Sequence, residues 1–205
     1  SAQGDTTDDL IEKAKEIISV GDYVTFAGSP QELLSGRVSG RSFDDRAAVT
    51  CLIEVAKRLN GKKLPFNVAF VLSDGEELGL RGARTASLKI NPNEAIAVDV
   101  SFGDGIGIGE EECGKLGKGG MIGISPTLDR TVSNKLISLA KEKSIPYQLE
   151  AMGGKTGSNA DMISVNREGV KTCTLSIPLR NMHTEVEILD GSEVDGGGDV
   201  LCEYI

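Results

Sequence analysis

The chain has 205 residues, which is enough for one domain with a real core or for one domain with a small appendage. Its net charge of −9 argues against nucleic acid or an anionic membrane surface as a partner, because both need faces rich in Lys and Arg. We see no run of about 20 apolar residues that would span a membrane and expect no signal peptide. The simplest expectation is a cytoplasmic protein.

The first third of the chain predicts two helices separated by two short strands. Apolar residues at helical spacing over 10–18 predict the first helix. Short strands are expected at 23–26 and 36–39, on either side of a turn rich in Gly, Ser and Pro. Residues 45–60 repeat the helical spacing of apolar side chains, and Gly61 ends that helix.

Beyond residue 61, strands are expected to alternate with helices. The apolar run at 66–72 is nearly continuous, which is typical of a strand covered on both faces. Further strands are expected at 95–100, 121–124, 147–151 and 170–177, and helices at 82–87, 132–143, 160–167 and over the last dozen residues. A Gly-rich loop separates the two halves at 103–120. This alternation predicts an α/β fold, with a mostly parallel mixed sheet and helices on both faces.

Acidic residues recur where the predicted strands end, and the only histidine closes the series. They are Asp44, the pair Glu76 and Glu77, Asp99, and finally His183. Because the carboxyl ends of strands border the ligand crevice of an open α/β sheet, these side chains are expected to converge. Carboxylates with one imidazole suit a divalent metal ion that activates water. The segment GGKTGS lacks the preceding glycine of a phosphate loop, so no nucleotide cofactor is expected.

Each of these residues also has a simpler interpretation. Asp44 can be the N-cap of the following helix, and the Glu76–Glu77 pair can be a solvated turn. A lone histidine such as His183 is often a hydrogen-bonded core residue. Asp99 is different, because a carboxylate that ends an apolar strand needs a partner or a metal ion. Four metal-ligating residues at four separate strand ends favour a shared metal site over coincidence.

Six long segments resemble the two-metal aminopeptidases of peptidase family M42. They are, in chain order, GRSFDDRAAVTCLIEVAKRL, VLSDGEELGLRGARTA, AIAVDVSFGDG, KLGKGGMIGISP, GGKTGSNADMISVNREGV and LSIPLRNMHTEVEILD. The match as a whole runs from about residue 21 to about residue 190. That family includes glutamyl, deblocking and TET aminopeptidases, and some of its members are labelled endoglucanase. The resemblance implies a zinc-aminopeptidase-like fold and an enzyme that releases N-terminal residues from peptides.

The resemblance also implies a role for each residue of the acidic series. Asp44 matches a carboxylate that bridges two divalent metal ions, expected to be zinc, with cobalt and manganese as alternatives. Glu77 and His183 match the other ligands of one ion, and Asp99 matches a ligand of the second. Glu76 matches the general base that takes a proton from the attacking water. The peptide bond that follows Asp44 is expected to be cis.

One departure from the family pattern changes the expected completeness of the site. The family has a His-x-Asp motif near its N-terminus, ahead of an inserted domain, whereas the only histidine here matches the C-terminal ligand. We therefore expect residues 1–39 to be a β-rich remnant of the inserted, dimerisation-type domain and residues 40–205 to be an incomplete catalytic peptidase domain. Assembly into a homo-oligomer, implied by the family, is expected to be weakened or altered.

Two alternatives to a working aminopeptidase stay open. The chain can be a catalytically incomplete fragment or a non-enzymatic remnant that keeps the fold and a partial metal site. An endoglucanase is less favoured, because glycoside hydrolysis needs two carboxyl groups about 5–10 Å apart and no metal ion. A series that includes His183 fits a metal site better.

Overall fold

Strand β6 (Lys171–Leu179) is the centre of the main sheet, since every residue of it after Lys171 is buried. In the computed structural model, which describes residues 6–205, the strand order is β3-β6-β4-β5. β3 (Glu94–Phe102) runs parallel to β6, and β4 (Gly120–Ile124) runs parallel to β5 (Tyr147–Ala151). β4 and β6 are antiparallel. The expectation of a mixed, mostly parallel sheet is therefore confirmed.

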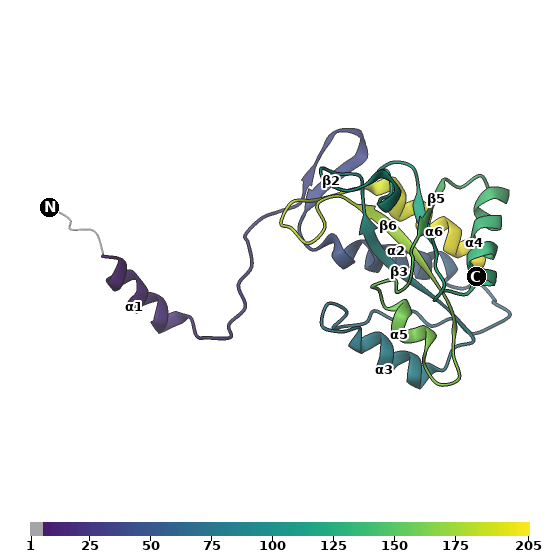
Figure 1. Ribbon diagram of the computed structural model, residues 1–205, viewed down its shortest axis with the longest axis horizontal. Coiled ribbons are helices and arrows are strands. Elements are labelled where there is room, and N and C mark those ends of the chain that lie inside the picture. The colour runs from purple at the N-terminus through teal and green to yellow at the C-terminus, as the bar shows by residue number, and fades with distance from the viewer. Residues whose placement is uncertain (1–5) are drawn as a thin grey trace.

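Helices cover both faces of this sheet, as alternating side chains along β3 require (Figure 1). Ile96 and Val98 contact the larger core cluster, to which α2 (Phe43–Leu59), α4 (Arg130–Glu142) and α6 (Gly191–Tyr204) contribute. Ala97, on the other face, packs with Ala160 of the short helix α5 (Ala160–Ser164) in a smaller cluster. Helix α3 (Arg81–Ile90) contacts α5 on that side. The predicted helices on both faces are present.

A second, three-stranded antiparallel sheet joins distant parts of the chain. It consists of β1 (Gln31–Glu32), β2 (Arg37–Gly40) and β7 (Glu187–Asp190), with β2 in the middle. Gly40 pairs with Glu187, so the segment that leads into α2 lies beside the segment that follows His183. The single-turn 3₁₀ helix η1 (Leu34–Gly36) connects β1 to β2.

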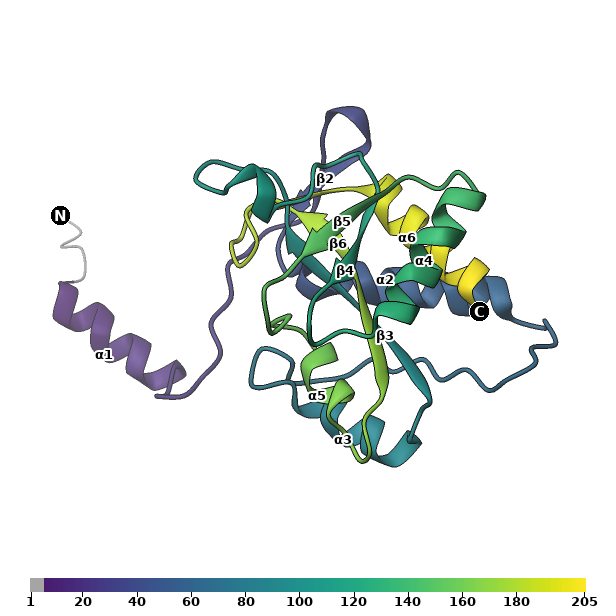
Figure 2. The ribbon, with the colours of Figure 1, turned by 45° about the vertical axis from the view of Figure 1, so that its right-hand side comes forward.

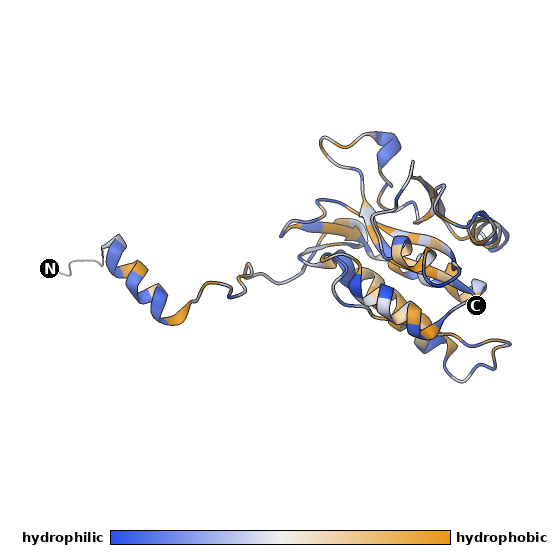
Figure 3. Ribbon diagram, turned by 60° about the horizontal axis from the view of Figure 1, so that its bottom comes forward, coloured by the Kyte–Doolittle hydropathy of each residue, from blue (hydrophilic) through white to orange (hydrophobic). Residues whose placement is uncertain are grey.

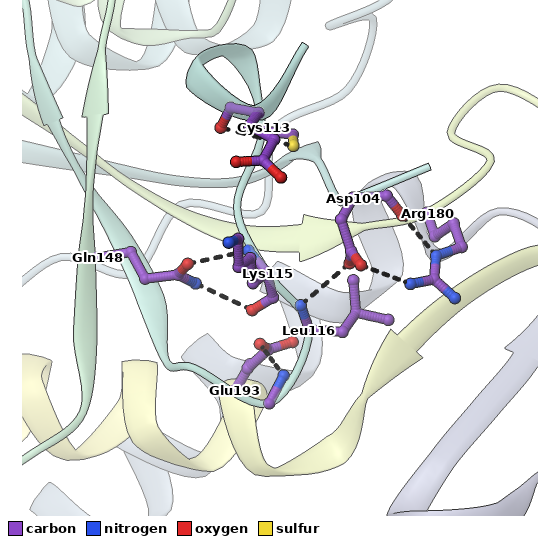
Figure 4. A network of polar contacts seen from close by, with 9 residues as sticks. Asp104, Cys113, Lys115, Leu116, Gln148, Arg180 and Glu193 are labelled. Carbon is purple, nitrogen blue, oxygen red and sulfur yellow. Dashed lines mark hydrogen bonds and ion pairs between the residues drawn. The ribbon is translucent and has the colours of Figure 1, made fainter. Parts of the chain in front are cut away.

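The Gly-rich loop after β3 is held by polar side chains from three other parts of the chain (Figure 4). Asp104 pairs with Arg180 at 2.8 Å and also accepts the amide of Leu116. Gln148 of β5 and Glu193 of α6 accept further amides of the loop. This loop includes one 3₁₀ turn, η2 (Glu110–Glu112). The predicted loop is thus irregular in backbone but anchored at several points.

Helix α1 (Thr7–Ile17) stands apart from the α/β body (Figures 1 and 2). A capping box between Thr6 and Asp9 starts the helix, and none of its residues is buried. Figure 3 shows hydrophobic and hydrophilic residues along it, as its amphipathic sequence predicts. Of the predicted remnant 1–39, residues 1–5 lie outside the described part of the chain. Within residues 6–205, no helix combines the length and apolar character that crossing a bilayer requires.

Two predicted strands do not form. Residues 23–26 and 66–72 are irregular, and the latter is largely exposed rather than covered on both faces, with Phe66 52% and Leu72 55% exposed. Within residues 6–205, the backbone of 66–72 makes no hydrogen bond to another backbone segment. The main sheet ends at β3, so this apolar segment has no strand beside it. A strand needs a neighbouring strand to pair with, and the described chain offers none beside residues 66–72. The apolar character of these residues is therefore not enough to make them a strand.

Most other predicted elements are confirmed to within a few residues. The strand predicted at 147–151 is β5, and the helices predicted at 45–60 and 132–143 are α2 and α4. The helix at the C-terminus is α6. Strand β7 was not predicted, because its four residues lie between the candidate ligand His183 and that helix.

Candidate metal centre

Asp44 lies in the irregular first turn of α2, a few residues after β2. Asp44 and Asp45 both depart from helical backbone angles, and the peptide bond between them is cis, as the resemblance implies. Ser42, just before this turn, adopts left-handed backbone angles. The irregular backbone keeps Asp44 out of the regular helix, and only 13% of its side chain is exposed.

His183 lies on the loop that connects β6 to β7. Reciprocal backbone hydrogen bonds between Arg180 and Ile188 close this loop at its base. His183 has a positive φ of 65°, and its side chain is 62% exposed. Its Nε2 atom lies 3.0 Å from Oδ2 of Asp44. The loop therefore brings the only histidine of the sequence against the first candidate carboxylate.

Glu76 and Glu77 lie on a tight turn that leads into α3. The amides of Gly79 and Leu80 both donate to the carbonyl oxygen of Glu76, and the amide of Gly82 donates to the carbonyl of Asp74. A Cβ at position 82 would lie 2.5 Å from that same carbonyl oxygen, so glycine is required there. This packed turn fixes where the two carboxylates project.

Two groups of side chains in the described residues have the composition and spacing of metal sites. The ligand atoms of Asp44, Glu77 and His183 all lie within 4.8 Å of one another. Those of Asp44, Asp45 and Asp99 do so as well, and Asp44 belongs to both groups. The first group lines a cavity of about 280 Å³. Two neighbouring groups that share one carboxylate match the donor chemistry of a two-metal centre.

The carboxylates of the two groups are held close together, and all of them except the exposed Glu77 have little solvent around them. Burial, together with the charge of neighbouring Glu77, raises the pKa of Asp44 to about 6. Burial, together with Asp99, raises the pKa of Asp45 to about 9. Asp99 is only 9% exposed, and burial raises its pKa to about 7. Burial also raises the pKa of Glu76, and the charge of Glu77 adds to this.

This electrostatic arrangement fits a bound cation. Clustered carboxylates that repel one another lose that repulsion when a divalent ion lies between them. Oxygen ligands with one imidazole suit Zn²⁺, Mn²⁺ or Co²⁺. The donor set therefore agrees with the metal chemistry expected from the sequence.

The structure brings the four predicted ligands into these two groups, although for partly different reasons, and Glu76 belongs to neither group. Asp44 and His183 follow strands, as expected, but Asp99 lies within β3 and Glu77 follows an irregular segment. Sequence reasoning missed Asp45 as a member of the second group. It also missed Glu187, a buried carboxylate that contacts two segments of the site. The only sequence signal for Glu187 was an acidic residue four positions after His183.

The family profile described as M42 glutamyl aminopeptidase matches residues 5–198. The chain belongs to this family. A lysyl aminopeptidase of Pyrococcus furiosus is 36% identical over 185 residues, which cover 90% of this chain and 53% of the relative. The chain thus spans about half the length of the curated relatives that it matches.

Solved structures of the family share the same fold. The aminopeptidase APDkam598 from the archaeon Desulfurococcus kamchatkensis is 33% identical with a TM-score of 0.87, covering 95% of this chain and 56% of that one. The TET1 peptidase of Pyrococcus horikoshii is 30% identical with a TM-score of 0.80, covering 94% of this chain and 57% of that one. That peptidase is described as assembling into a tetrahedron or a large octahedral shell. The aminopeptidase fold expected from the sequence is confirmed.

Proposed function

We propose that this chain is a metal-dependent aminopeptidase that releases N-terminal residues from peptides. The observation that carries the proposal is the pair of ligand groups that share Asp44 in a chain of the M42 family. In this proposal Glu77 and His183 complete one metal site with Asp44, and Asp99 belongs to the second. Bound divalent ions supply Lewis-acid polarisation of the scissile carbonyl and a lowered pKa of water.

Glu76 is the proposed general base. It lies next to the candidate ligand Glu77 in sequence, and the charges of Asp44, Glu77 and His183 all act on its carboxyl group. Its raised pKa brings the carboxylate closer to the range in which it can both accept a proton from water and return it to the leaving amine. Adjacent glutamates can take different roles because side chains on an irregular turn point in different directions.

The first experiment measures metal content and turnover together. Elemental analysis is expected to find zinc, cobalt or manganese bound to the purified chain. Hydrolysis of aminoacyl p-nitroanilides is expected to stop when a chelator removes the metal and to return when metal is restored. A chain that binds no metal and shows no turnover would instead be a catalytically incomplete remnant of the fold.

A Glu76→Gln variant separates the base from the ligands. We expect metal content to stay at the wild-type level and turnover to fall by at least about 10²-fold, as for loss of a general base. The matched control is Glu77→Gln, which is expected to lose metal affinity as well. Loss of metal in Glu76→Gln would identify Glu76 as a ligand and overturn its assignment as the base.

We also propose that the chain associates with copies of itself, more weakly than the assemblies of its TET relatives. Large apolar side chains between Leu10 and Phe26 are exposed, which favours association. The related PhTET1-12s structure is described as a dodecamer. Size-exclusion chromatography with light scattering is expected to give a species smaller than that for this chain. A dodecamer would contradict this proposal and leave the proposed chemistry untouched.

A further inference from the structure

Glu187 connects two irregular segments of the candidate metal centre. It is the first residue of β7 and is only 2% exposed. Its Oε2 atom accepts the backbone amide of Phe43 at 2.7 Å, and its Oε1 atom accepts the backbone amide of His183 at 3.1 Å. One buried carboxylate thus binds the residue before Asp44 and the candidate ligand His183.

Both segments lack regular backbone pairing at these positions. Ser42, which precedes Phe43, has a positive φ of 57°, and His183 has a positive φ of 65°. Such backbone conformations persist when the surrounding structure holds them. The two amides point at Glu187, so its side chain supplies the acceptor that each amide lacks in the backbone.

We propose that Glu187 is a positioning residue of the metal centre. By binding both amides at once, its carboxylate fixes the separation of Asp44 and His183, whose Oδ2 and Nε2 atoms lie 3.0 Å apart. The inference rests on the proposed function, in which these two residues hold a metal ion. Glu187 itself acts through the backbone, because both of its oxygens accept amides and it belongs to neither ligand group.

The chemistry of the contact requires a carboxylate. A carboxylate offers acceptor oxygens to both amides, whereas a glutamine at the same position offers one acceptor and one N–H₂ donor. In Glu187→Gln, one of the two amides would therefore face another donor. The backbone at Phe43 or at His183 must then move, and the ligand geometry with it.

The test compares Glu187→Gln with Glu193→Gln. Glu193 is also fully buried and also accepts a backbone amide, that of Gly117 at 2.7 Å, but it lies outside the cavity lining. Zinc affinity is measured by calorimetric titration of the metal-free chain. Because the sequence has a single histidine, ¹⁵N-histidine labelling gives one backbone amide signal, which reports the bond to Glu187 directly.

We expect Glu187→Gln to weaken zinc binding by about 10–100-fold, the usual effect of removing a group that orients a metal ligand. The His183 amide proton is expected to shift upfield even without metal, because it loses its bond to a charged acceptor. Glu193→Gln should leave zinc affinity and the amide signal unchanged. The conservative variant Glu187→Asp is not expected to keep wild-type zinc affinity, because its shorter side chain cannot reach both amides.

The outcomes separate this inference from the proposed function. Wild-type zinc affinity in Glu187→Gln, or an unmoved His183 signal, would overturn the positioning role while the metal site stands. Equal losses of affinity in Glu187→Gln and Glu193→Gln would also overturn it, since they would show that the loss is not specific to the carboxylate that binds Phe43 and His183. A wild-type chain without zinc affinity would overturn both. If Glu187→Gln does not fold, rapid exchange of the wild-type His183 amide would still refute the contact, because a bonded amide is protected.

Discussion

Glu193 is the least exposed acidic residue among residues 6–205, since 0% of the residue's surface is accessible to solvent. It lies in the first turn of α6, where one oxygen accepts the amide of Gly117 (Figure 4). Its other oxygen, Oε2, has no hydrogen-bond partner within residues 6–205. Burial raises the pKa of Glu193 from 4.5 to about 7, so the neutral form is favoured in the folded state.

This shift predicts a pH dependence of stability. The folded state binds the Glu193 proton more tightly than the unfolded state, so the free energy of unfolding falls as the pH rises from about 4.5 to about 7. Glu193→Gln stays neutral and avoids that loss. Relative to wild type, the free energy of unfolding of the variant should rise by up to about 3 kcal/mol over this window and should not rise further above it.

Denaturant unfolding in chelator at several pH values measures the difference in free energy of unfolding between variant and wild type. A difference that does not depend on pH would refute the prediction. Glu16→Gln, on exposed α1, is the control.

The candidate site shows which residues a sequence can indicate. Asp44 and His183 could be predicted because acids and imidazoles that follow strands tend to converge at one edge of a sheet. Glu187 could not, since its role depends on contact with Phe43, 144 positions away in the sequence. That contact follows from the pairing of β2 with β7, and two short strands carry too little periodicity to predict it.

At the scale of single elements, α6 is unusual because three consecutive glycines lie inside it, at 196–198. Glycine in a helix interior costs about 1 kcal/mol relative to alanine, since it loses more backbone entropy on folding. Packing compensates, because Val200 and Leu201 are buried in the main core cluster. Gly197 and Gly198 lie against Cys51 and Val55 of α2, so the small residues let the two helices approach closely.

Gly196 differs from its neighbours, because a Cβ there would meet nothing within 4 Å. Gly196→Ala is therefore expected to raise the free energy of unfolding by about 0.5–1 kcal/mol through reduced entropy of the unfolded chain. Chemical denaturation followed by circular dichroism checks this. The control is Gly123→Ala, where a Cβ would overlap Oγ1 of Thr174 at 1.9 Å and should destabilise the fold. A loss of stability in Gly196→Ala would show that the site has no free space in solution.

Element prediction succeeded where local pattern is enough and failed where a distant partner is needed. The helical spacing of apolar residues gave α2 and α4 to within two residues, because one buried face suffices to define a helix. Residues 66–72 have the apolar run of a buried strand but no neighbouring strand in the described chain. Hydropathy predicts burial, whereas a strand also needs backbone pairing that lies elsewhere in the sequence.

At the scale of the whole molecule, residues 6–30 and the α/β body differ in how they are stabilised. The body has a continuous core that joins α2, α4, α6 and β6. Helix α1 has 11 residues and none is buried, so its own capping box and side-chain pairs must hold it. Isolated helices of this length are marginal in water. The division at residue 39 expected from the sequence stays a prediction.

This difference predicts the effect of removing the first 22 residues, which leaves Thr25 and Phe26 in the cavity lining. A chain of residues 23–205 should unfold within about 0.5 kcal/mol of the full chain, because the deleted part buries no side chain of its helix. Its zinc affinity should also be unchanged. Both chains are compared by urea unfolding at concentrations where light scattering gives the same association state. Leu201→Ala, which truncates a core residue of α6, is the control and should cost about 2–5 kcal/mol. A loss above about 1 kcal/mol on deletion would mean that α1 packs against the body in solution, contrary to its separate position in Figures 1 and 2.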